Sequence, residues 1–161
     1  VNMARGRSKA GKRAGIFIGG FIFGLVRGIF FNNKYKIRVE QNVSYGKAAG
    51  LCNYNKRLIL LDCHDGRGLL NKADDTISHE LGHMIDYNYV THTFASNGAK
   101  FKEIYNKERL TIDVDYNYDY ITKDPQEYFA QSFSEYIRQP YRLKSSAPKT
   151  YEFMKQYIES L

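Results

Sequence analysis

The order of apolar and polar residues predicts strands early in the chain and helices later. Residues 35–40 alternate between apolar and charged side chains, as a half-exposed strand does. Residues 58–61 form a short apolar run that suits a covered strand, whereas residues 44–55, with their glycine, asparagine and serine, indicate a turn. Strands that precede a run of helices favour an α+β fold.

Helical spacing of apolar residues begins in the middle of the chain. Ile77, Leu81 and Met84 recur at helical intervals and predict a helix over residues 72–89, with residues 73–76 offering caps and first-turn acids. Asp124 followed by Pro125 is a typical helix start. The remaining predicted elements are a loop over 91–98 and helices over 99–110, 125–139 and 148–160.

Composition and charge separate a basic arm from a nearly neutral body. The chain has 161 residues, is 43% hydrophobic and carries a net charge of +7. Residues 1–13 contribute five basic side chains and no acid, so they predict a flexible arm, and residues 14–161 predict a single domain. No aromatic and basic residues interleave and no base-reading motif is present, so we expect no nucleic-acid partner.

Residues 14–31 are the most apolar stretch of the chain. Their uncharged run, residues 14–26, is too short to span a bilayer as a helix. Glycines spaced four apart within this stretch would give a helix a smooth ridge for close contact, and we favour a helix or a strand pair that packs on the core. Membrane contact through residues 14–31, or a retained signal segment, stays open as an alternative. Because the chain begins at Val1, it also stays open that it is part of a larger polypeptide.

The chain has two cysteines, Cys52 and Cys63. A hairpin between them would bring them together. We favour two free thiols, and a disulfide is the open alternative.

The motif His79-Glu80-Leu81-Gly82-His83 carries the strongest chemical signal. Histidines four residues apart share one face of a helix, so both imidazoles can bind one Zn²⁺. The glutamate between them can take a proton from water at that metal. The alternative is two histidines on a helix surface without a metal. A catalytic zinc also requires a third protein ligand and one position for water.

Four residues are candidates for the third ligand. Asp86 is better placed to orient a ligand histidine than to reach the metal. His64 and His92 fall in predicted loops, where a lone histidine is usually exposed. Glu127 lies at the start of the helix over 125–139, and pattern alone leaves it open between a ligand and a surface glutamate stabilised by the helix dipole.

Two segments together resemble a known family. They are His79-Glu80-Leu81-Gly82-His83-Met84-Ile85-Asp86 and Glu127-Tyr128-Phe129-Ala130-Gln131-Ser132-Phe133. They resemble the catalytic domain of anthrax lethal factor and the related secreted Pro-Pro endopeptidases, which are zincin-like metallopeptidases. The resemblance covers residues 75–136 and implies a zincin-like fold, in which a small mixed sheet packs on the metal-binding helix and the C-terminal half is helical.

The resemblance also assigns roles to individual residues. It implies Glu127 as the third zinc ligand and Tyr120, seven residues earlier, as a stabiliser of the oxyanion. The chain departs from the family at Gln131, where a second glutamate is usual. A neutral amide can still hydrogen-bond a ligand, so we expect Gln131 to support the metal site from behind, with metal affinity lowered but not lost.

The sequence therefore predicts a zinc-dependent endopeptidase acting on a protein or peptide. His79, His83 and Glu127 would hold one Zn²⁺, Glu80 would be the general base, and Tyr120 would stabilise the oxyanion. A toxin or effector domain that is secreted or delivered into a target cell is the expected setting. The alternative function is a non-catalytic, zinc-bound structural or partner-binding domain of a larger assembly.

Two features predict where substrate binds. Acidic residues gather just before Glu127, and they would favour a basic peptide if they line the cleft. They are Asp113, Asp115, Asp119 and Asp124, of which Asp115 and Asp119 are the predicted substrate contacts. A solvated acidic loop is equally compatible with them. The strand over 58–61 is predicted to be the sheet edge, so that Leu60 and Leu61 would pair with an extended substrate.

Overall fold

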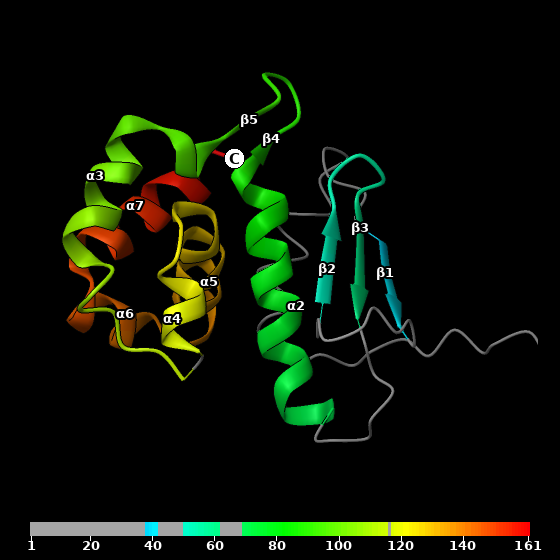
Figure 1. Ribbon diagram of the computed structural model, residues 1–161, viewed down its shortest axis with the longest axis horizontal. Coiled ribbons are helices and arrows are strands. Elements are labelled where there is room, and N and C mark those ends of the chain that lie inside the picture. The colour runs from blue at the N-terminus through cyan, green and yellow to red at the C-terminus, as the bar shows by residue number, and fades with distance from the viewer. Residues whose placement is uncertain (1–37, 42–49, 62–68, 116) are drawn as a thin grey trace, which may run out of the picture.

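A computed structural model of the chain describes residues 38–41, 50–61, 69–115 and 117–161. Its elements form three layers, with a helix between a small sheet and a group of helices, as Figure 1 shows. The strands are β1 (Arg38–Gln41), β2 (Gly50–Asn53), β3 (Leu58–Leu61), β4 (Tyr87–Asn88) and β5 (Thr93–Phe94). The helices are α2 (Leu69–Asp86), α3 (Ala99–Glu108), α4 (Tyr118–Ile121), α5 (Pro125–Arg138), α6 (Pro140–Ser146) and α7 (Pro148–Glu159). The predicted α+β class is confirmed.

The sheet beside α2 has the strand order β1-β3-β2. β3 pairs in parallel with β1 and antiparallel with β2, with Leu60 opposite Leu51 and Leu61 opposite Gly50. β3 is therefore the central strand, and the prediction that Leu60 and Leu61 form a free edge for substrate is wrong. Among the described strands, β2 is the edge nearest α2 (Figure 1).

β2 lies inside the segment that the sequence predicted as a turn. The glycine that suggested a turn is needed instead for close packing, because a Cβ added at Gly50 would lie 2.7 Å from Thr76 Cγ2 of α2. The true turn between β2 and β3 contains Arg57 with a positive φ of 49°. Cys52 of β2 is a free thiol, whereas Cys63 lies outside the described residues.

The helix boundaries differ from the prediction most at the ends of α2. This helix begins at Leu69, so residues 73–76 lie within it and do not cap it. It ends at Asp86, and the next residues form the β4–β5 hairpin, part of which was predicted as a loop. Helices α3, α5 and α7 confirm the three later predicted helices. The sequence analysis missed α4 and α6, and α6 begins at the proline that ends α5.

The main core lies between α2 and α5. The helical spacing predicted for α2 is confirmed, because its apolar face is buried against the apolar face of α5. Gly82 faces Ala130 at this contact, and a Cβ added there would lie 2.6 Å from the Ala130 Cα atom. The two helices thus approach each other closely at a point within the histidine motif. Their buried apolar residues are Ile77, Leu81, Met84 and Ile85 from α2 and Tyr128, Phe129, Ala130, Phe133 and Ile137 from α5.

The start of α5 is capped as predicted. The Asp124 carboxylate accepts hydrogen bonds from the backbone N–H groups of Gln126 and Glu127, at 2.9 and 3.0 Å. Pro125 occupies the first helical turn, where its missing N–H costs nothing. This cap fixes the backbone that carries Glu127.

Several predictions fall on residues outside the described part of the chain. They concern the arm of residues 1–13, the apolar stretch of residues 14–31 and His64. Within the described part, no helix combines the length and apolar character needed to cross a membrane.

Candidate metal centre

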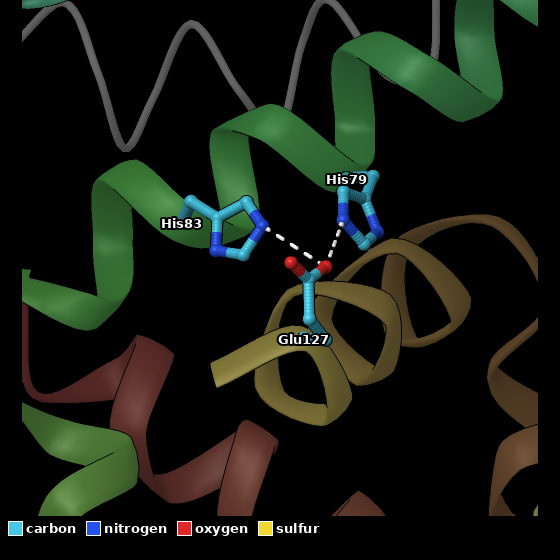
Figure 2. Close-up of side chains that lie close together, drawn as sticks. All are labelled: His79, His83 and Glu127. Atoms are coloured by element: carbon cyan, nitrogen blue, oxygen red, sulfur yellow. Dashed lines mark hydrogen bonds and ion pairs between the residues drawn. The ribbon is translucent and has the colours of Figure 1, made fainter. Parts of the chain in front are cut away.

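Three side chains from two helices converge on one point. His79 and His83 extend from successive turns of α2, and Glu127 extends from the first turn of α5 between the two imidazoles, as Figure 2 shows. Glu127 Oε2 lies 3.1 Å from His79 Nε2 and 3.4 Å from His83 Nε2. One donor atom from each residue lies within 4.8 Å of the others, so the group could hold a metal ion. The structure thus brings together the ligands that the sequence suggested.

The electrostatics of this group favour negative charge on the glutamate. Burial alone would raise the pKa of Glu127, but hydrogen bonds with His79 and His83 hold that pKa well below its usual range. Burial opposes a charge on His83, yet the neighbouring Glu127 carboxylate raises the pKa of its imidazole. A cation is therefore favoured at the position between these side chains.

The donor set fits a divalent transition metal. Gln131 Oε1 lies 3.0 Å from His79 Nδ1, so the other ring nitrogen, Nε2, faces Glu127. Two imidazole nitrogens and one carboxylate oxygen are the ligands that zinc and its neighbours in the first transition series prefer. Gln131 is buried and contacts the candidate ligand His79 on the side away from Glu127, so its predicted role behind the metal site stays a prediction.

Glu80 lies beside the ligands, and only 8% of its surface is exposed. Burial raises the pKa of this carboxyl, which is the direction that suits a general base working near neutral pH. The backbone of β2 passes directly over it, because a Cβ added at Gly50 would lie 2.8 Å from Glu80 Oε1. The edge strand and the candidate base are thus neighbours.

Tyr120 and Lys123 both contact the glutamate oxygen that does not face the histidines. The Tyr120 hydroxyl donates to Glu127 Oε1 at 2.8 Å, and Lys123 Nζ lies 3.4 Å from the same oxygen. Lys123 also lies 3.8 Å from the centre of the Tyr120 ring. The two carboxylate oxygens therefore have separate partners, which leaves Oε2 to a metal. Tyr120 thus contacts the candidate ligand Glu127, and its role at the oxyanion stays a prediction.

Asp86 occupies a different position from the one predicted. It is fully buried, and its two oxygens accept hydrogen bonds from the Ser96 backbone N–H and hydroxyl at 2.7 and 2.6 Å. It therefore joins the end of α2 to the turn after β5 and does not orient His83 through a hydrogen bond. Its charge still acts through space to raise the pKa of His83. Burial raises the pKa of Asp86 itself to about 6.

The predicted acidic cleft loses support from the residues that were to line it. The Asp115 carboxylate pairs with Arg142 at 2.8 Å, and this contact holds the pKa of Asp115 below its usual range. Asp124 is used as the cap of α5. Asp119 is exposed in α4 and remains a predicted substrate contact. His92 lies in the β4–β5 turn, bonded to the Tyr87 hydroxyl at 2.8 Å, and is not part of the metal group.

Sequence reasoning missed several residues that shape the site. Glu135 lies four residues after Gln131 in α5, so helical spacing could have indicated their contact. Lys123 contacts Glu127 from outside the helix, before the Asp124 cap, where helical spacing gives no guide. Gly82 lies within the histidine motif but gives no sign of its packing partner. Arg142 reaches Glu135 from α6, an element that was not predicted.

Comparison with known proteins shows the family of this chain. Residues 32–157 match the family described as anthrax toxin lethal factor, N- and C-terminal domain. The chain belongs to this family.

The chain is similar to two Pro-Pro endopeptidases. That of Clostridioides difficile (strain 630) is 35% identical over 89 residues, which cover 52% of this chain and 38% of the relative. The structure of the Pro-Pro endopeptidase from Paenibacillus alvei matches with a TM-score of 0.50 and 27% identity, over 68% of this chain and 57% of that one. The zincin-like fold is therefore confirmed. The match spans well under half of the length of the Clostridioides difficile relative.

Substitution of Gly82 tests whether the close approach of α2 and α5 positions Glu127 beside the histidines. We expect Gly82→Ala to force α5 away from α2, because the new Cβ would collide with the Ala130 backbone. The free energy of unfolding should fall by roughly 1–3 kcal/mol, and metal affinity should fall with it because Glu127 moves with α5. Urea unfolding and metal titration measure both effects.

Gly98→Ala is the matched control for this substitution. Its added Cβ would meet Ala95 O at 3.1 Å, at the start of α3 and away from the metal group. We expect a smaller loss of stability and unchanged metal affinity. Equal effects of the two substitutions on metal binding would contradict the role of the Gly82 contact.

Proposed function

We propose that this chain is a zinc-dependent endopeptidase that hydrolyses peptide bonds of a protein substrate. The observation that carries the proposal is the convergence of His79, His83 and Glu127, with the buried Glu80 beside them. Similarity to two Pro-Pro endopeptidases supports the reaction class.

His79, His83 and Glu127 would hold the zinc. When bound by three protein ligands, Zn²⁺ leaves a coordination position for water, lowers the pKa of that water to around 7 and polarises a substrate carbonyl. The lowered pKa of Glu127 and the orientation of His79 by Gln131 prepare both side chains as ligands.

Glu80 and Tyr120 would carry the remaining chemistry. Glu80 would accept a proton from the attacking water and pass it to the leaving amine, and its raised pKa suits both steps. The Tyr120 hydroxyl lies beside Glu127 Oε1 and would donate to the substrate oxygen as negative charge develops there. Both groups would act on the same peptide bond.

The edge strand β2 would bind the substrate. An extended peptide added to β2 would gain backbone hydrogen bonds and run beside Glu80, because Gly50 contacts that side chain. Peptides with consecutive prolines are the first substrates to test, since both relatives are Pro-Pro endopeptidases. Secretion or delivery into a target cell, as a toxin or effector, stays a prediction.

Cleavage of an unbiased peptide library, enriched with proline-proline sequences, tests this function. We expect cleavage that stops when a chelator removes the metal and returns when zinc is added. One tightly bound zinc per chain without cleavage of any peptide would contradict the proposal and favour a non-catalytic zinc domain.

Tyr120→Phe tests the stabilisation of the oxyanion. Removing one such donor costs about 10²–10³-fold in kcat, and we expect a loss of that size with zinc still bound. Tyr141→Phe is the control, because Tyr141 is 88% exposed in α6. Steady-state kinetics on a library-derived peptide compare the variants. An unchanged kcat for Tyr120→Phe would rule out this role.

A further inference from the structure

A buried chain of hydrogen bonds extends from His79 away from the metal group. Gln131 Oε1 lies 3.0 Å from His79 Nδ1, and Gln131 Nε2 donates to Glu135 Oε1 at 3.0 Å. Arg142 of α6 then donates to Glu135 Oε2 at 2.8 Å. Gln131 and Glu135 are 3% and 1% exposed, so these contacts are shielded from water. The chain thus links the candidate ligand to a buried ion pair.

The direction of these hydrogen bonds is determined by the groups at the far end. A carboxylate only accepts hydrogen bonds, and one oxygen of the Glu135 carboxylate accepts from Arg142 while the other faces Gln131. The amide of Gln131 must therefore turn its NH₂ group toward Glu135 and its oxygen toward His79. An oxygen can only accept, so His79 Nδ1 must carry a proton, and the lone pair of Nε2 is left for the metal.

We propose that Glu135 and Arg142 are positioning residues for the metal site, because they set the orientation of the Gln131 amide and through it the tautomer of His79. The consequence for catalysis rests on the proposed function, whereas the consequence for metal binding does not. Arg142 is itself held by Asp115, which it contacts at 2.8 Å. Asp115, which was predicted to bind substrate, thus holds Arg142 in place.

The arrangement also gives a physical reason for glutamine at position 131. A carboxylate there would place a second negative charge about as close to Glu135 as the present 3.0 Å hydrogen bond. Two buried carboxylates at that distance repel each other unless one takes up a proton. Gln131 and Glu135 are therefore complementary, and a glutamate at position 131 requires a neutral partner at position 135.

The test measures zinc affinity and the exchange rate of the His79 Nδ1 proton in the full, zinc-loaded chain, the second by NMR. In Glu135→Gln, the new amide can turn the Gln131 amide around, which places an NH₂ group against His79 Nδ1. We expect zinc affinity to fall about 10–100-fold, as it does when partners behind a metal ligand are lost, and the Nδ1 proton to exchange faster. Glu103→Gln, at an exposed residue of α3 that pairs with Lys107, is the matched control.

Exchanging the glutamine at position 131 with the glutamate at position 135 distinguishes an effect on the orientation of the amide from an effect on packing. Gln131→Glu alone should weaken zinc binding, because two carboxylates then face each other. The double variant Gln131→Glu with Glu135→Gln should recover most of the zinc affinity. The carboxylate at position 131 then accepts hydrogen bonds from His79 and from the amide at position 135, and the oxygen of that amide accepts from Arg142. Thermal unfolding of each variant ensures that measurements are made well below the midpoint.

Three results would overturn this inference. The first is a Glu135→Gln variant whose zinc affinity and His79 Nδ1 proton exchange rate equal those of Glu103→Gln. The second is a Glu135→Gln variant in which only the unfolding midpoint is lowered. The third is a double variant that binds zinc no more tightly than Gln131→Glu alone. Zinc binding by the unaltered chain without peptide cleavage would defeat the proposed function while leaving this inference standing.

Discussion

Glu80→Gln is expected to abolish peptide cleavage while one zinc ion stays bound. The substitution keeps the size of the side chain but removes the group that accepts a proton from the attacking water. A general base contributes about 10²–10⁴-fold, and we expect kcat to fall by at least that range. Glu80 does not belong to the metal group, so zinc content should not change. Kinetics on a library-derived peptide and metal analysis of the purified variant measure the two quantities.

The control for Glu80→Gln is Glu152→Gln, at an exposed position of α7. It changes the net charge equally and should leave both kcat and zinc content unaltered. Cleavage by Glu80→Gln at a rate near that of the unaltered chain would eliminate Glu80 as the base. Loss of zinc from this variant would instead indicate that Glu80 supports the metal.

Glu127→Ala should lose the metal itself. Glu127 Oε2 is the atom that lies close to both imidazoles, and it comes from a different helix. Two histidines on one helix remain, and they lack the third protein ligand that a catalytic zinc requires. We expect zinc affinity to fall by more than the roughly 100-fold that loss of a supporting hydrogen bond causes, and cleavage to disappear. Competition with a coloured chelator measures the affinity.

Two further variants support the interpretation of Glu127→Ala. Glu127→Gln keeps the shape of the side chain and a weaker oxygen ligand, so its zinc affinity should lie between those of Glu127→Ala and the unaltered chain. Gln126→Ala, at the neighbouring position of the same helical turn, should bind zinc normally. Full zinc occupancy in a folded Glu127→Ala chain would refute the assignment of Glu127 as a ligand.

Local sequence patterns were sufficient for much of the helical half. The apolar spacing of α2 and the Asp124-Pro125 start of α5 both depend on residues close together in the chain, and both are confirmed. The strands were harder to predict. A four-residue strand such as β2 has too few side chains to show a period, and Gly50 suggested a turn because its packing partner on α2 could not be known.

The errors in the candidate site have a common cause. Asp86 and Asp115 were interpreted by their charge and by their distance along the chain from the metal motif. Their actual partners, Ser96 and Arg142, lie in elements that the sequence analysis had called a loop or had not predicted. Hydrogen bonds between side chains far apart in sequence depend on how elements pack, which no local pattern contains.

The sequence by itself determined that His79 and His83 share one face of a helix with Glu80 between them, because helical geometry follows from spacing along the chain alone. The tertiary structure decided which carboxylate completes the group. Glu127 is 48 residues from His79, and it reaches Nε2 because Gly82 lets α2 and α5 approach closely at Ala130. It also decided that, of the described strands, β2 and not β3 lies at the sheet edge beside Glu80, since strand order depends on pairing between segments and not on the residues of either strand alone.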